Sequence, residues 1–173
     1  VIFVFTLFTF NVSKSYSQKN ETKLRYLDSI AFSALESNSD QTTKHANALL
    51  KASSKLPPSI FRVNGNIILG IVNKEKGYFV TSLNHYLKAL NAAEDINDEG
   101  RRSSCLNNIG TVYQLQGNYQ KAKEYFQKSL DIEENLNNSL QKSIRLYNIG
   151  EVYRDLDSFD LALRRRFQWI EKT

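Results

Sequence analysis

The sequence predicts an all-α fold in which helical hairpins stack into a right-handed solenoid. Three glycines, Gly70, Gly110 and Gly150, stand 40 residues apart in similar surroundings. The apolar residues around them recur at the i, i+3, i+4 and i+7 spacing of one helix face. The chain also has only 7 Gly and 2 Pro among its 173 residues, whereas a β-sandwich needs turn residues about every 8–12 positions. The composition therefore excludes a fold built mainly of strands.

Residues 1–17 differ in composition from the rest of the chain. Residues 1–12 are almost entirely apolar, and Ser15 and Ser17 then form the small-x-small pattern that a signal peptidase accepts. The segment resembles the hydrophobic region and cleavage site of a secretory signal peptide whose charged start is lost, which predicts cleavage after Ser17. A buried strand and an uncleaved signal anchor are the alternatives, although a membrane span requires about 20 apolar residues.

The chain opens at Val1 inside this apolar run and contains no methionine. We therefore expect it to be part of a longer bacterial protein that is exported to the periplasm or the extracytoplasmic face. An anchor, if one exists, is expected beyond residue 173, because no stretch after residue 17 is long and apolar enough to span a membrane.

The remainder, residues 18–173, is predicted to be one helical repeat domain. Its first hairpin is the least regular, with helical patterns over residues 22–37 and 40–56, and Pro57-Pro58 ends the second of these helices. The fourth hairpin is expected to continue beyond residue 173. The four predicted hairpins cover approximately residues 22–56, 59–95, 99–136 and 139–173.

The second, third and fourth hairpins share one pattern. A glycine in the first helix is followed 12 positions later by a small residue in the second helix. Small residues at the crossing let two helices approach to about 8–10 Å. Turns are predicted at Gly77-Tyr78, Gly117-Asn118 and Asp157-Ser158. The packing positions are Gly70, Ser82 and Tyr86, then Leu106, Ile109, Gly110, Tyr113, Ala122 and Phe126, then Leu146, Ile149, Gly150, Tyr153 and Ala162.

This pattern resembles the tetratricopeptide repeat, whose signature is a large residue, x2, Leu-Gly, x2, Tyr, then Ala-x3-Phe and often Pro. The third hairpin fills every position except the final Pro. The fourth departs from it at Arg166, which stands where the family has an aromatic residue. An alternative apolar stripe there consists of Phe159, Leu163, Phe167 and Ile170. HEAT-type repeats have a period nearer 40 residues but lack this signature.

The sequence contains no recognisable catalytic, metal-binding or cofactor-binding motif. It has no Gly-rich phosphate loop and no His-Glu-x-x-His motif. The single cysteine, Cys105, cannot form an internal disulfide or a Cys-based zinc site. His45 and His85 stand at equivalent repeat positions, and we interpret them as surface or packing residues rather than a metal pair. The chain is therefore expected to have no enzymatic activity and no cofactor.

The charge of the chain is moderate, with a formal net charge of +5. Its sharpest basic cluster is Arg164–Arg166, but Asp160 and Glu171 dilute this cluster and the other positive residues are scattered. Nucleic-acid-binding domains usually concentrate their positive charge on one face. We therefore expect no nucleic-acid partner.

The resemblance implies a binding role, because stacked hairpins form an extended concave surface that the first helix of each hairpin lines in this family. The residues expected there are mostly polar and suit a protein or peptide ligand. Members that clamp a terminal carboxylate use several Lys, Arg and Asn residues, and only Lys74 and Arg154 are available here. The candidate binding residues are Asn64, Ile67, Ile71, Lys74, Ser104, Asn107, Thr111, Gln114, Ile144, Tyr147, Glu151 and Arg154.

Three functional hypotheses follow from the resemblance. The first is a protein-binding module that forms the extracytoplasmic sensor or scaffold part of a longer signal-transduction protein. The second is a substrate-recruiting arm of an enzyme whose catalytic domain lies beyond residue 173. The third is a separate scaffold of the cell envelope.

Overall fold

The computed structural model describes residue 18 and residues 20–35 and 38–170, and for residues 158 and 160–170 it describes the backbone alone. The predicted signal peptide over residues 1–17 lies outside the described residues. Within the described ranges no helix is both long enough and apolar enough to cross a membrane.

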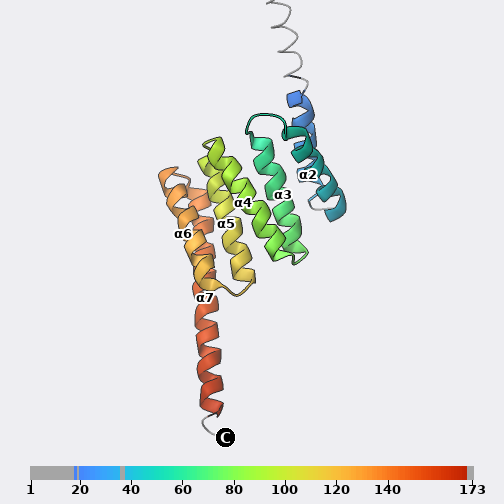
Figure 1. Ribbon diagram of the computed structural model, residues 1–173. Helices are drawn as coiled ribbons and strands as arrows, with labels where there is room; N and C mark the ends of the chain where they lie inside the picture. Colours follow the sequence, from blue (N-terminus) through green and yellow to red (C-terminus); the bar gives the residue numbers. More distant parts are fainter. Residues whose placement is uncertain (1–17, 19, 36–37, 171–173) are drawn as a thin grey trace, which may run out of the picture.

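Seven helices and no strand make up the described part of the chain (Figure 1). They stack side by side in chain order, so the predicted all-α solenoid is confirmed. A first helix over residues 20–33 is followed by α2 (Ser39–Ser53), α3 (Ile60–Glu75), α4 (Phe79–Asp95), α5 (Glu99–Leu115), α6 (Tyr119–Asn135) and α7 (Ser139–Ile170).

The four turns between α3 and α7 share one geometry. In the turn after α3, the Gly77 N–H donates to the Lys74 carbonyl at 3.0 Å and the Tyr78 N–H donates to the Asn73 carbonyl at 2.8 Å. This pair of bonds is the Schellman motif, which requires a residue in the left-handed region at its centre. The residues at that position are Gly77, Asn97, Gly117 and Asn137, with φ between 53° and 76°.

The fourth predicted hairpin is different, because α7 runs as one helix from Ser139 to Ile170. The predicted turn at Asp157-Ser158 is therefore wrong, and the described chain has seven helices where eight were expected. Asp157 stands 40 residues after Gly117, at the position where the turn needs a left-handed residue. Aspartate adopts that conformation less readily than glycine, and at this position the helix continues.

Inside the second and third hairpins, the glycines allow the close approach that the sequence predicts. A Cβ placed on Gly70 would lie 2.5 Å from Cε1 of Tyr86, and one placed on Gly110 would lie 2.7 Å from Cδ1 of Phe126. Both aromatic rings are fully buried. The Ser82 hydroxyl also donates to the Gly70 carbonyl at 2.8 Å, which fixes α4 against α3.

The fourth unit lacks this packing. Apart from the backbone of α7 itself, no atom of the described residues lies within 4 Å of a Cβ placed on Gly150. Leu146 and Tyr153 are 50% and 47% exposed. We call the surface formed by Leu146, Gly150 and Tyr153 the open face of α7. These three residues were predicted to pack inside a hairpin, and that prediction is wrong because α7 continues where the second helix of the hairpin was expected. Tyr153 is instead contacted from α6, where Nζ of Lys123 lies 4.8 Å from the centroid of its ring. The side chain of Ala162 lies outside the description.

The hairpins pack on one another through apolar clusters. Each cluster joins the second helix of one hairpin to the first helix of the next, as expected for a solenoid in which a unit contacts mainly its neighbours. Tyr86 of α4, for example, packs with Ile109 and Val112 of α5. In the same way, Ala122 and Phe126 of α6 pack with Val152 of α7.

One contact between hairpins is ionic rather than apolar. Nη2 of Arg145 lies 3.4 Å from Oε1 of Glu133, and both side chains are almost completely buried between α6 and α7. The residues one repeat earlier are Ala93 and Cys105, which lie in an apolar cluster between α4 and α5. Burial lowers the pKa of Arg145, and the negative charge of Glu133 partly offsets this shift. The α6–α7 contact is thus distinguished from the α4–α5 contact by a buried pair of charges.

Candidate binding surface on the first helices of the repeats

Polar side chains connect the first helices of successive hairpins. Nδ2 of Asn148 in α7 donates to Oδ1 of Asn107 in α5 at 2.7 Å. Nε2 of Gln114 in α5 donates to Oδ2 of Asp155 in α7 at 2.9 Å. A third connection joins the first helix to α3 and α5. We call the surface that these bonds mark the polar face, which consists of Asp28, Asn64, Arg101, Asn107, Gln114, Asn148 and Asp155.

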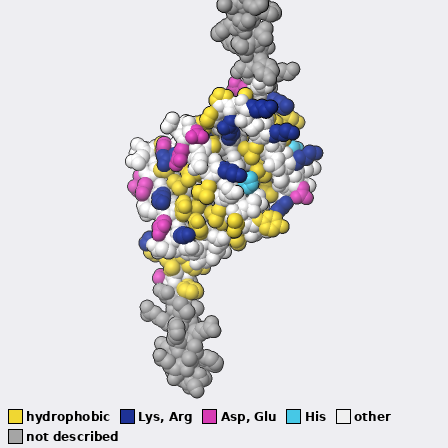
Figure 2. Space-filling model, viewed as in Figure 1, with side chains coloured by type: hydrophobic (Ala, Val, Ile, Leu, Met, Phe, Trp, Pro, Cys, Tyr) yellow, Lys and Arg dark blue, Asp and Glu magenta, His cyan; other side chains and the backbone are white. Residues whose placement is uncertain are grey.

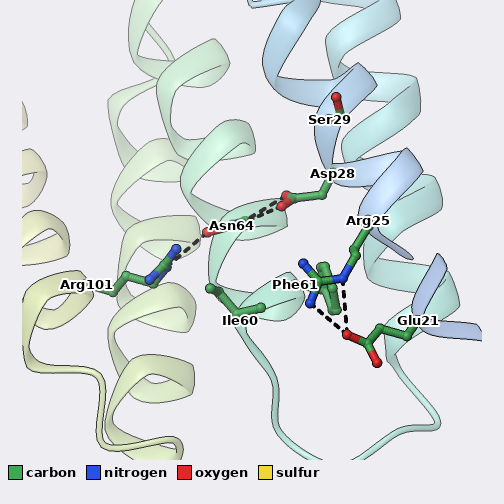
Figure 3. A pocket seen from close by; sticks show the side chains of 8 residues that line it. All are labelled: Glu21, Arg25, Asp28, Ser29, Ile60, Phe61, Asn64 and Arg101. Atoms are coloured by element: carbon green, nitrogen blue, oxygen red, sulfur yellow. Dashed lines mark hydrogen bonds and ion pairs between the residues drawn. The ribbon is translucent and has the colours of Figure 1, made fainter. Parts of the chain in front are cut away.

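Asn64 is the centre of the third connection (Figure 3). Its side-chain Nδ2 donates to Oδ1 and Oδ2 of Asp28 at 3.1 and 2.9 Å, and its Oδ1 accepts from Nε of Arg101 at 3.2 Å. Arg101 is also paired with Asp98, with Nη1 and Oδ2 2.8 Å apart. Three helices are thus held together by one amide that is only 5% exposed.

The carboxyl group of Asp28 has a raised pKa. Burial disfavours its charged form, and this effect exceeds the opposing effects of the Asn64 hydrogen bond and the positive charge of Arg101. The group therefore gains protons more readily than a free aspartate as the pH falls. Each of its oxygens accepts one hydrogen bond from the Asn64 amide, so each keeps the capacity to accept from a further donor.

A pocket opens beside this network, between the first helix and α3 (Figure 3). Its volume is about 360 Å³, within the range of about 300–1,000 Å³ that is usual for ligand pockets. Its wall combines an aromatic ring, aliphatic carbon and charged groups of both signs. The lining residues are Glu21, Arg25, Asp28, Ser29, Ile60, Phe61, Asn64 and Arg101.

The charged groups at this pocket are arranged in pairs. Arg25 bonds Glu21 with Nη2 and Oε1 2.7 Å apart, and both side chains are well exposed. Exposed ion pairs contribute at most about 1 kcal/mol, so a ligand can displace this one at small cost. The pocket can therefore offer both a carboxylate and a guanidinium to a polar chain.

The structure brings three of the predicted binding residues into the polar face. Asn64, Asn107 and Gln114 all form the inter-helix bonds described above. Their amides were expected to face a ligand, and the structure shows that part of their hydrogen-bonding capacity joins neighbouring repeats.

Other predicted residues are placed differently. Ile67 and Ile71 pack against the apolar clusters between α3, α4 and α5. The Ser104 and Thr111 hydroxyls donate to carbonyls of their own helix, at 3.0 Å each. Lys74, in the last turn of α3, is half-buried. These residues contribute less to a binding surface than the sequence suggested.

The predicted residues of α7 are the most accessible. Ile144 and Tyr147 are 39% and 65% exposed, and Glu151 forms an ion pair with Arg154. Tyr147 precedes Asn148, so an exposed aromatic ring lies at the border of the polar face. A partner can pack an apolar side chain against this exposed ring.

Sequence reasoning missed four members of the polar face. They are Asp28, Arg101, Asn148 and Asp155. Asn107 and Asn148, like Gln114 and Asp155, are 41 residues apart. Asn148 and Asp155 could have been found from sequence as polar residues that follow a polar residue of the previous first helix by the repeat period plus one.

The charges on the molecular surface are mixed. Figure 2 shows positive and negative side chains interspersed over the face in view, with hydrophobic side chains between them. Within the described residues, no cluster of His, Cys, Asp and Glu side chains is arranged to hold a metal ion.

Comparison with known proteins identifies similar sequences and folds. A family model described as the tetratricopeptide repeat matches residues 64–135 and, in an overlapping second match, residues 101–165. No curated protein matches the chain.

Solved structures resemble the fold over most of the chain. The apo form of RapI shares 19% identity with a TM-score of 0.72, covering 87% of this chain and 56% of its own. A Rap protein in complex with Competence and Sporulation Factor shares 19% identity with a TM-score of 0.73, and the match covers 87% of this chain and 42% of that protein. A STAND protein with a tetratricopeptide repeat sensor, from Pyrococcus horikoshii, shares 17% identity with a TM-score of 0.70. That match covers 82% of this chain and 22% of the STAND protein. The chain thus spans roughly a fifth to just over half of the length of these proteins.

Proposed function

Because the chain belongs to the tetratricopeptide repeat family, whose solenoids are protein–protein interaction modules, we propose that its polar face binds an extended segment of a partner protein. The single observation that supports this assignment is the row of side-chain amides and carboxylates across the first helices. Their spare donors and acceptors match those of a peptide backbone, which carries one N–H and one C=O per residue.

The pocket and the exposed aromatic ring define the two ends of this proposed site. At one end, Asp28, Asn64 and Arg101 surround a cavity of about 360 Å³, where a polar side chain of the partner can bind. At the other end, the Tyr147 ring can cover an apolar side chain. A partner segment would thus contact the first helix, α3, α5 and α7 together.

We further propose that the module is exported and senses or scaffolds a partner outside the cytoplasm, as part of a longer signalling protein. The apolar residues 1–12 and the small-x-small pattern after them support export. The similar STAND protein, in which a tetratricopeptide repeat is named as the sensor, supports the sensing part. To test export, the chain is expressed in a bacterial host behind an added Met and a short basic segment that restore the charged start. Detection of residues 18 onward in the periplasmic fraction supports export, and retention of this chain in the cytoplasm would contradict it.

The binding proposal is tested by selecting random 12-residue peptides by phage display against the full chain. The affinities of the selected peptides are then measured by fluorescence polarisation. Asn107→Ala and Tyr147→Ala are expected to weaken binding by about tenfold or more, as truncation of a well-placed aromatic or hydrogen-bonding group does at an interface. The matched control is Tyr78→Ala, because Tyr78 is 61% exposed in the turn after α3.

The outcome is decided by the comparison of these variants. Loss of affinity in the two polar-face variants, with wild-type affinity in Tyr78→Ala, supports the polar face as the binding site. Selected peptides that bind all three variants equally well would place the site elsewhere, and a library that yields no enriched peptide would contradict the proposed function.

A further inference from the structure

The open face of α7 has the shape that elsewhere in this molecule holds a second helix. Gly70 and Gly110 each lie against an aromatic ring 16 residues later in the chain, on α4 and α6. Gly150 is at the equivalent position of α7, and among the described residues no side chain or other helix lies within 4 Å of its added Cβ. Leu106 of α5 is 7% exposed, whereas its equivalent Leu146 is 50% exposed. Within the part of the chain that the structure describes, no second helix covers this surface.

A segment that matches the second helix of the third hairpin at two packing positions is present in the same chain, with Arg166 in place of Phe126. Residues 159–170 begin with Phe159, which stands at the position of Tyr119, and include Ala162 at the position of Ala122. Ala122 is the residue whose carbonyl oxygen lies 3.2 Å from a Cβ placed on Gly110. The segment also has an apolar stripe at helical spacing. Residues 159–170 thus have the sequence pattern of the second helix of a hairpin, although they form the last part of α7.

That segment does not lie against the open face, because α7 is continuous. The helix extends without interruption through residue 157 to Ile170, and its last turns project away from the other helices (Figure 1). Residues of one straight helix cannot pack on an earlier part of the same helix. The open face and residues 159–170 are therefore complementary surfaces that one chain, in this conformation, leaves apart.

We propose that the open face of α7 binds residues 159–170 of a second copy of this chain, in a reciprocal pair that exchanges the second helix of the fourth hairpin. Such an exchange is a domain swap, in which each copy supplies the element that the other lacks. The two α7 helices would be antiparallel, since helices of one hairpin are antiparallel in α3–α4 and α5–α6. A two-fold axis near residue 157 would relate them.

The charges of the two segments agree with the alignment that the repeat spacing gives. The spacing of Gly70 from Tyr86 and of Gly110 from Phe126 aligns Gly150 with position 166 of the second copy. The basic cluster at positions 164–166 of the second copy then lies opposite residues 150–152, which include Glu151. Opposite charges would therefore be adjacent along the edge of the pair, which favours this orientation.

Cysteine cross-linking tests the register directly. In the full chain with Gly150→Cys and Ala162→Cys, a short bismaleimide is expected to give a covalent dimer on a denaturing gel. Cys105 does not interfere, because it is fully buried and burial raises its pKa to about 12. A cross-link within one chain would show that the chain closes its own hairpin, and no cross-link would show that the surfaces do not meet. Either result would overturn the proposal.

Sedimentation equilibrium tests the apolar contact independently. Wild-type protein is expected to be dimeric at micromolar concentrations, and Leu146→Asp is expected to raise the dimer dissociation constant about tenfold or more. Leu146 is already half exposed, so this change leaves the single copy folded. The matched control is Val80→Asp on α4, which is 80% exposed and should leave the dissociation constant unchanged. A monomeric wild type, or equal effects of the two substitutions, would overturn the proposal.

Discussion

The helices α5 and α7 carry nearly the same motif in different environments. Both contain Leu-x2-Ile-Gly-x2-Tyr, yet Gly110 of α5 lies against the ring of Phe126, whereas Gly150 of α7 faces open space. The motif thus determines which face of the helix is shaped for a neighbour. Whether a second helix packs on that face depends on the residues that follow the motif.

Two later differences separate these units. Gly117 ends α5 with φ at 72°, and Asp157 at the equivalent position stays within α7. Phe126 fills the hollow beside Gly110, and Arg166 is the residue 16 positions after Gly150. A repeat signature read in the first helix therefore says little about the turn that must follow it.

The largest expected effect comes from making α7 more like α5 at one position. Arg145→Cys copies Cys105, but it leaves Glu133 buried without its counter-ion. Removing one partner of a buried ion pair typically costs about 3–5 kcal/mol. The free energy of unfolding, measured by urea denaturation followed by circular dichroism, should fall by about that amount.

The double variant Glu133→Ala/Arg145→Cys sharpens the same comparison. It reproduces the apolar pair Ala93 and Cys105, so most of the stability lost in Arg145→Cys should return. If the single variant is as stable as wild type, the pair is not buried in solution as described.

A smaller effect is expected from Gly110→Leu, which should lower the free energy of unfolding by about 3 kcal/mol. A Cβ at this position already approaches Phe126 to 2.7 Å, and overpacking typically costs about 1–3 kcal/mol. Gly150→Leu serves as the matched variant, and it should raise the stability of the single copy by up to about 1 kcal/mol, because leucine has a higher helix propensity than glycine. Thermal unfolding of the two proteins checks this, and equal losses would refute the assigned packing.

Changing the turn residue has a smaller effect again. Gly117→Ala should cost about 1–2 kcal/mol, because a residue with a Cβ disfavours the left-handed region. The cost is conformational rather than steric, since no atom lies within 4 Å of the added Cβ. Gly117→Asn should cost less, because Asn97 and Asn137 already occupy the same conformation in neighbouring turns. Urea denaturation of both variants would contradict this explanation if Asn were the worse substitute.

The smallest expected change in stability accompanies Asp157→Gly, which introduces a turn residue into α7. Glycine inside a helix costs about 1 kcal/mol, and here it also permits the chain to reverse. In the Gly150→Cys/Ala162→Cys background, the added glycine should favour cross-linking within one chain. An unchanged ratio of products would show that Asp157 does not keep α7 continuous.

The hairpin fold was predictable from sequence because it depends on local periodicity and on the 40-residue repeat. Gly70 and Gly110 and their aromatic partners lie as predicted. The turn at Asp157-Ser158 was predicted wrongly because two polar residues resemble a helix start, whereas the turn depends on one left-handed residue. That requirement is visible only when Gly77, Asn97, Gly117 and Asn137 are compared.

The binding surface was predicted less completely than the fold. Asn64, Asn107 and Gln114 lie on the polar face, but their partners lie one residue beyond the repeat period, three residues short of it, or on the first helix. Pairing between repeats depends on how far each hairpin rotates relative to the last, and the period alone does not specify that rotation. Ile67 and Ile71 were assigned to the surface for the same reason, although they pack inward.

The buried pair of Glu133 and Arg145 has a consequence for folding. Hairpins built on one repeat resemble one another, so a helix can stack on the wrong neighbour while the chain is still collapsing. If α7 stacked on α4 in place of α6, Arg145 would face Ala93 and lose its counter-ion. Only the native stacking order of the helices pairs the charges of Glu133 and Arg145. This pair therefore favours the stacking of α7 on α6 over its stacking on a similar helix.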